Sequence, residues 1–111
     1  MKKTSHKSQR INGEVQKELS RIIRMELKDP RINPMTSVTD VTVTQDLKYC
    51  KAYISVLGDS ESAAETLKGL EQASGYIRHE LARTINLRNT PELTFVLDTS
   101  IEYGNYMSKR I

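Results

Sequence analysis

The sequence predicts an α+β fold in which a three-stranded sheet carries helices on one face. Three observations support this prediction. A long amphipathic segment occupies residues 8–28, alternating apolar and polar residues fill two runs within 37–57 and a third within 91–98, and a helical segment over 67–85 is interrupted near its middle. The predicted order is therefore helix, strand, strand, helix, kink, helix, strand.

The first predicted helix has an apolar face and a basic face. Its apolar residues recur at helical spacing, at Ile11, Val15, Leu19, Ile22, Ile23 and Leu27. Its basic residues gather within about 60° on the opposite side, at Arg10, Lys17, Arg21, Arg24 and Lys28. This basic face is either a polyanion-binding ridge or an ordinary solvated surface. Glu26 falls on the apolar side, where the sequence identifies no partner for it.

The next segment predicts an antiparallel pair of strands. Asp29-Pro30 ends the helix, because proline lacks the amide that a helix needs and restricts the residue before it. From Ser37 onward, Val41 and Val43 alternate with polar residues, and residues 50–56 alternate in the same way. The short polar stretch at residues 45–48 is the expected turn between the two strands.

The second helical segment is expected to begin at a capping box of Ser62 and Glu65. Apolar residues then step at helical spacing on both sides of an interruption at residues 73–75. Glycine inside a helix costs roughly 1 kcal/mol relative to alanine, so Gly75 marks either a bend or a tolerated glycine, and Gly69 is expected to be tolerated. Pro91 opens the last strand, and residues 99–111 are expected to form a short helix.

Composition indicates one small domain. The 111 residues divide into an expected flexible basic tail at 1–8, a folded domain at 9–98 and a short carboxyl-terminal tail at 99–111. A single cysteine excludes an intramolecular disulfide, and no apolar run approaches the roughly 20 residues of a membrane span. We therefore expect a cytoplasmic protein without a membrane partner. Residues 1–28 hold eight Lys and Arg against three Glu, which favours a polyanionic partner.

Catalytic and metal-binding patterns are missing from the sequence. His6, His79 and Cys50 have no ligand spacing, and no glycine-rich phosphate loop is present. Asp29, Asp40 and Asp46 are better explained as helix-breaking, strand-surface and turn residues than as acid–base groups. The sequence therefore predicts a protein that is not an enzyme and has no cofactor.

The predicted order of elements matches the type II K-homology (KH) topology, and the residues themselves resemble the ribosome-binding factor A family over about residues 8–107. The resemblance rests on the joint order and spacing of short motifs. These are Glu18-Leu19, Lys28-Asp29-Pro30-Arg31, Val38-Thr39-Asp40-Val41, Asp46-Leu47, Ala73-Ser74-Gly75-Tyr76-Ile77-Arg78, Leu87-Arg88 and Pro91-Glu92-Leu93-Thr94-Phe95.

The resemblance implies a bacterial assembly factor without enzymatic activity. Such a factor binds the maturing small (30S) ribosomal subunit and its 16S rRNA, assists maturation of the rRNA 5′ end and supports adaptation to cold. Assembly GTPases that act on the same subunit are candidate further partners, and we expect a monomer. The family also replaces the Gly-x-x-Gly loop of other KH domains with an Ala-x-Gly kink, which is Ala73-Ser74-Gly75 here.

The candidate RNA-binding residues are the cations of the first helix and its end, the kink, and the arginines that follow. They are Arg10, Lys17, Arg21, Arg24, Lys28, Arg31, Ala73, Ser74, Gly75, Arg78, Arg83 and Arg88. Tyr53 and Tyr76 either stack on bases or serve as packing residues. The alternative function is a protein-interaction module whose basic helix docks on an acidic protein surface.

Overall fold

The computed structural model describes residues 6–87 and 89–98, with side chains from Arg10 onward. The elements are α1 (His6–Arg21), the π-helical turn η1 (Ile22–Glu26), β1 (Thr36–Val43), β2 (Tyr49–Val56), α2 (Ser60–Gln72), α3 (Ser74–Thr84) and β3 (Glu92–Leu97). The predicted α+β class and the predicted order of elements are therefore confirmed. The expected helix at 99–111, most of the amino-terminal tail and Arg88 lie outside the described residues.

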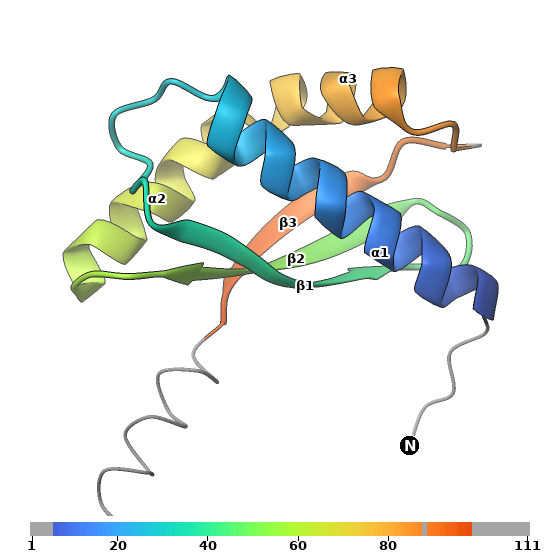
Figure 1. Cartoon of the computed structure of the whole chain (residues 1–111), viewed down its shortest axis with the longest axis horizontal. Helices are drawn as coiled ribbons and strands as arrows, with labels where there is room; N and C mark the ends of the chain where they lie inside the picture. Colours follow the sequence, from blue (N-terminus) through green and yellow to red (C-terminus); the bar gives the residue numbers. More distant parts are fainter. Residues whose placement is uncertain (1–5, 88, 99–111) are drawn as a thin grey trace, which may run out of the picture.

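The three strands form one sheet in the order β1-β2-β3. β1 pairs with β2 in the antiparallel direction, and β2 pairs with β3 in the parallel direction. A parallel pair needs a long crossover connection, which α2 and α3 supply. Figure 1 shows that the three helices gather on one side of the sheet, as the sequence predicts.

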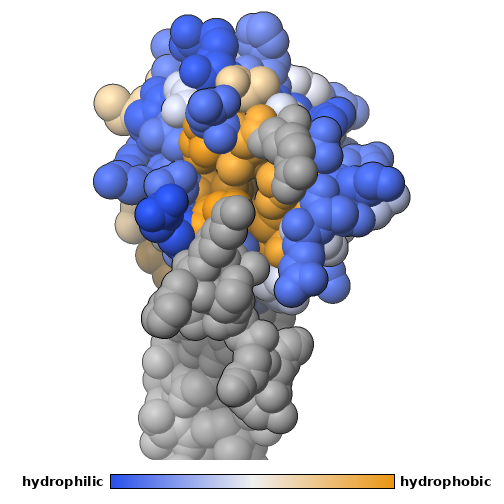
Figure 2. All heavy atoms as spheres, turned by 90° about the vertical axis from the view of Figure 1, so that its right-hand side faces the viewer, coloured by the Kyte–Doolittle hydropathy of each residue, from blue (hydrophilic) through white to orange (hydrophobic). Residues whose placement is uncertain are grey.

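The core lies between this helical layer and the sheet. Inward-pointing strand residues meet the apolar faces of the helices, and the largest fully buried side chains include Leu19, Ile22, Ile54, Leu70, Ile77 and Leu81. Figure 2 views the end of the molecule at the right of Figure 1, where hydrophilic side chains surround an apolar area. The expected apolar faces of all three helices are thus the faces that form the core.

β1 contains a bulge that the alternating pattern does not predict. The register shifts between Val38 and Asp40, so Thr39 is an extra residue opposite Tyr53. The Thr39 hydroxyl donates a hydrogen bond to the carboxylate of Asp98, just beyond β3. After the bulge, Val41 and Val43 point into the core as predicted. The extra residue therefore restores the inward phase of the strand.

The first helix ends earlier than the sequence predicts. Regular α-helix stops at Arg21, and the chain continues through the wider turn η1, where the Leu27 amide donates to the Ile22 carbonyl across 3.2 Å. Leu27 is already extended, so Lys28 lies in the linker. The prediction that Lys28 is part of the helix is therefore wrong. The wider turn buries both Ile22 and Ile23, although they are neighbours in the sequence.

The start of the second helix also differs from the prediction. Asp59 is the residue that caps α2, because its carboxylate accepts a hydrogen bond of 2.8 Å from the Ser62 amide. The expected capping box of Ser62 and Glu65 is therefore wrong. The Ser62 hydroxyl instead accepts a hydrogen bond of 2.8 Å from Asn33 in the linker before β1.

The predicted interruption between the helices is confirmed at Ala73, whose backbone (φ −90°, ψ 2°) separates α2 from α3. The two glycines near it have opposite roles. A Cβ on Gly69 would lie 2.9 Å from Ile32 Cγ1, so Gly69 is required for close packing and is not merely tolerated. A Cβ on Gly75 would meet nothing within 4 Å among the described residues. The fold itself therefore does not require Gly75.

Candidate nucleic-acid interface

Three of the predicted cations form a row along α1 and η1. Arg10, Lys17 and Arg24 are spaced seven residues apart, so they lie close to the same side of the helix over about 21 Å. All three are exposed, and none has a hydrogen bond or ion pair with another described residue. We call these residues the basic row. Lys28 is also exposed, but it lies in the linker beyond η1.

Four other predicted arginines contact the protein itself. Arg21 pairs with Glu18 and Glu26, Arg31 pairs with Asp29 and bonds Gln72, Arg83 pairs with Glu80, and Arg78 donates to the carbonyls of Thr90 and Pro91. Three of these guanidinium groups therefore face a carboxylate, which reduces the positive potential that they offer to a polyanion. Arg88, also predicted, lies outside the described residues.

Glu26 connects the first helix to the kink. Its carboxylate accepts a hydrogen bond of 3.1 Å from Arg21 Nη1 and another of 3.0 Å from the Tyr76 hydroxyl. The hydrogen bond to a carboxylate raises the pKa of the Tyr76 phenol, because ionisation would remove the donated proton. We call Arg21, Glu26 and Tyr76 the latch. It supplies the partner of Glu26 that the sequence does not identify.

The latch lies directly beside the predicted Ala73-Ser74-Gly75 kink. Tyr76 follows Gly75 in the chain, and its side chain remains 44% exposed although its hydroxyl is bonded. Gly75 is exposed, whereas Ala73 and Ser74 are half-buried. The structure therefore joins the kink to the end of the first helix, whose outer side carries the basic row.

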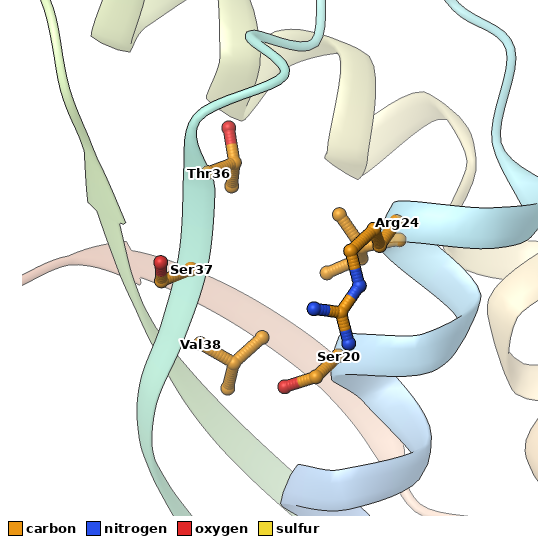
Figure 3. Close-up of a pocket in the computed structure, with 6 residues that line it drawn as sticks. Ser20, Arg24, Thr36, Ser37 and Val38 are labelled. Carbon is orange, nitrogen blue, oxygen red and sulfur yellow. The ribbon is translucent and has the colours of Figure 1, made fainter.

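A small depression separates the end of the first helix from β1. It has a volume of about 100 Å³ and is lined by Ser20, Ile23, Arg24, Thr36, Ser37 and Val38. Figure 3 shows the Arg24 guanidinium and the Ser20 hydroxyl in the space between the helix and the strand. Of these residues, the sequence predicts only Arg24 as RNA-binding, and it does not predict the two serines or Thr36.

Two further depressions lie elsewhere on the surface. One of about 590 Å³ is lined by Lys48, Tyr49, Arg78, Asn89, Thr90 and Glu92. Another of about 280 Å³ lies between α1 and the end of α3, lined by Glu14, Lys17, Glu18, Thr84, Ile85 and Asn86. Carboxylates line both, so neither offers an anion a purely positive surface.

The described residues hold no arrangement typical of a metal or nucleophilic site. They include no cluster of three metal-ligating side chains. Burial raises the pKa of the Cys50 thiol to about 12, which suppresses the reactive thiolate. Within the same part of the chain, each helix is too short or too polar to cross a bilayer.

Comparisons with known proteins assign the family. The sequence profile of ribosome-binding factor A matches residues 7–111. Ribosome-binding factor A of Lachnospira eligens is 68% identical over 111 residues, covering 100% of this chain and 85% of the relative.

Solved structures show the same fold. A candidate ribosome-binding factor A of Thermotoga maritima superimposes with a TM-score of 0.76 at 29% identity, covering 92% of this chain and 96% of that one. A homology model of Thermus thermophilus ribosome-binding factor A, as fitted into a cryo-EM map of a 30S complex, superimposes with a TM-score of 0.65 at 24% identity, covering 79% of this chain and 91% of that one. The chain therefore belongs to the ribosome-binding factor A family.

Proposed function

We propose that this protein binds the maturing small ribosomal subunit through its 16S rRNA, without catalysing a reaction. Family membership supports this proposal, because a Thermus thermophilus member is described in a 30S complex. The observation that carries it is the basic row, in which Arg10, Lys17 and Arg24 are exposed and unpaired with any other described residue. Exposed, unpaired cations in a row suit electrostatic contacts with a phosphate backbone.

The kink is the second contact that we propose. Gly75 is exposed, and a side chain there would meet no described atom, so the space above the kink is open to an external backbone. The latch of Arg21, Glu26 and Tyr76 fixes this open backbone relative to the basic row. Arg21, Arg31, Arg78 and Arg83 then serve mainly to hold the framework, and Lys28 extends the cationic surface into the linker.

The cellular role that we propose follows the family. The protein assists maturation of the 5′ end of 16S rRNA and supports adaptation to cold, acting as a cytoplasmic monomer. Assembly GTPases that act on the same subunit are further partners in this proposal. We expect recognition to depend on RNA shape and backbone and not on stacking of bases. Tyr76 at the kink donates a hydrogen bond to Glu26, and the sequence has few other aromatic residues.

Co-sedimentation with immature and mature small subunits tests this function. We expect the protein to sediment with immature subunits, and structured rRNA fragments to displace it in a salt-dependent manner. Displacement by polyglutamate at equal charge concentration, with no displacement by rRNA, would favour a protein-interaction module. Failure to sediment with either subunit would contradict the proposed function.

A further inference from the structure

A stripe of polar side chains on α1 and η1 lies along the open edge of β1. We call Asn12, Gln16, Ser20 and Arg24 the polar stripe. β1 is an edge strand, so half of its backbone groups have no partner strand. Asn12 Oδ1 accepts a hydrogen bond of 3.0 Å from the Val43 amide, and Gln16 Nε2 donates one of 3.1 Å to the Val38 carbonyl. The helix therefore satisfies the strand edge with residues spaced by four.

The same spacing continues to Ser20 and Arg24, but there the pattern changes. These two side chains make no hydrogen bond with another described residue, and the depression of about 100 Å³ opens between them and β1. Figure 3 shows the Arg24 guanidinium and the Ser20 hydroxyl in this opening, while the Ser37 hydroxyl lies on the far side of the strand. Ser20 and Arg24, the last two residues of the polar stripe, thus face an open space, whereas Asn12 and Gln16 contact the backbone of β1.

The donors that reach this space favour an anion. In an extended strand the N–H and C=O of one residue point the same way, and the Val38 carbonyl points toward α1, so its N–H does too. The Arg24 guanidinium, the Ser20 hydroxyl and the Val38 amide can therefore converge. Among the described residues no carboxylate lines the depression, and the Thr36 hydroxyl already donates to the Asn33 carbonyl.

The size of the depression limits the ligand to a small group. A volume of about 100 Å³ is more than one water needs and admits a group of a few heavy atoms. A phosphate offers several acceptor oxygens, and the planar guanidinium of an arginine binds two of them at once. Arg24 is also the last member of the basic row, so an anion seated here continues the line of charge from Arg10 and Lys17.

We propose that this depression is a binding site for a single phosphate of the RNA backbone, held by Arg24, Ser20 and the Val38 amide. The inference rests on the proposed binding to rRNA and names one contact within it. Ser20 adds a second hydrogen-bond donor beside the guanidinium, which an isolated surface arginine lacks. The site therefore predicts that Ser20 and Arg24 act on the same phosphate and depend on each other.

A double-mutant cycle on binding to small subunits tests this dependence. The variants are Arg24→Gln, Ser20→Ala and the pair, with Lys17→Gln as the matched loss of one charge from the basic row outside the depression. Affinity is measured at several salt concentrations. Alanine is a good helix former, so Ser20→Ala retains the fold, and thermal unfolding of each variant verifies this.

We expect Arg24→Gln to weaken binding roughly tenfold or more and to lower the salt slope by about one. We expect Ser20→Ala to weaken binding of the parent about threefold to tenfold and to leave its salt slope unchanged. Added to Arg24→Gln, Ser20→Ala should not weaken binding further. In Lys17→Gln, Ser20→Ala retains its full effect. Arg24→Lys recovers the slope but only part of the affinity, because lysine lacks the planar fork.

The outcomes separate this site from the general function. If the parent protein binds subunits but Ser20→Ala binds like the parent, or loses equally in all backgrounds, the phosphate site is wrong while rRNA binding stands. If the parent itself does not bind subunits, the proposed function fails first. Displacement by polyglutamate but not by rRNA, with the Ser20 and Arg24 coupling retained, would assign the site to a protein carboxylate and overturn the phosphate assignment.

Discussion

The Tyr76 hydroxyl, at the start of α3, donates a hydrogen bond of 3.0 Å to the Glu26 carboxylate at the end of η1. The two residues are 50 positions apart in the sequence. Because Arg21 bonds the same carboxylate, the end of the first helix and the kink are held by one acidic group. This contact determines how the exposed kink lies relative to the basic row.

Tyr76→Phe removes one hydrogen bond of the latch, and its effect should depend on pH. The pKa of Tyr76 is raised in the folded state by the bond to Glu26, so the bond adds stability below the unfolded pKa of about 10. This contribution disappears as the pH rises through the folded pKa. We expect the parent to be the more stable protein near neutral pH and the difference to shrink at high pH, in chemical unfolding monitored by circular dichroism. Tyr49→Phe, at another exposed tyrosine, is the control for the loss of a phenol hydroxyl outside the latch.

Asp29→Asn tests the opposite pH dependence in the linker after η1. Three hydrogen bonds from Arg31, the shortest of 2.6 Å, hold the pKa of Asp29 at about 2. A lowered pKa stabilises the fold above the unfolded value near 3.9, and this contribution is lost as the pH falls toward 2. We expect Asp29→Asn to unfold more easily than the parent at pH 6 and about equally near pH 2. A difference in the free energy of unfolding that stays constant from pH 6 to pH 2 would contradict this role. Glu71→Gln, at an exposed position of α2, is the control.

Gly69→Ala and Gly75→Ala should have opposite effects on stability. A Cβ at Gly69 would approach Ile32 Cγ1 to 2.9 Å and Asp29 Oδ2 to 3.4 Å, so we expect a net loss of about 1–2 kcal/mol. Gly75 is exposed and helical, so alanine there should be neutral or stabilising by up to about 1 kcal/mol. Urea unfolding measures both.

The same two variants separate packing from binding at the kink. If RNA backbone lies close to Gly75, Gly75→Ala and the larger Gly75→Leu should bind subunits progressively less well while remaining folded. Parent-like co-sedimentation of folded Gly75→Leu would remove the kink from the proposed interface and leave the basic row.

Asn33→Ala tests how the linker before β1 is fixed. Its amide nitrogen donates to the Leu57 carbonyl at 3.2 Å and to Ser62 at 2.8 Å, and its amide oxygen accepts from Met35 at 2.7 Å. We expect alanine to cost about 1–3 kcal/mol in the free energy of unfolding, because these groups lose their partner together. Asn86→Ala, exposed beyond α3, should remain within about 0.5 kcal/mol of the parent. Equal effects of the two variants would contradict the assigned role.

Local sequence patterns predict most of the fold. The alternation at Val41 and Val43 and the interruption at Ala73 predict the backbone correctly, because each depends on neighbours in the chain. The break at Asp29-Pro30 predicts that the first helix ends, but the helix ends earlier, because Leu27 is already extended. The π-helical turn and the bulge at Thr39 leave no such signal. Each inserts a residue to fit the core, so it depends on what packs against the segment.

The candidate site is less predictable from the sequence, because the tertiary structure decides which charged residues form ion pairs with one another. A helical projection places Arg21 and Arg24 on one basic face, yet Arg21 pairs with Glu26 and Arg24 has no described partner. The bond from Tyr76 to Glu26 spans 50 positions and has no local pattern. One feature that the sequence-based prediction missed does have a signal in the sequence. Polar residues recur every four positions along α1 and η1, at Asn12, Gln16, Ser20 and Arg24.

Binding of charge-reversed variants to immature small subunits tests most directly that the basic row is the main rRNA contact. Lys17→Glu with Arg24→Glu changes the row, and Lys51→Glu with Lys68→Glu makes the same change in net charge at exposed lysines of β2 and α2. We predict that the first pair abolishes co-sedimentation, that the second pair binds close to the parent, and that both unfold at temperatures near the parent's. Equal loss in the two folded proteins, or parent-like binding of the first, would contradict the account.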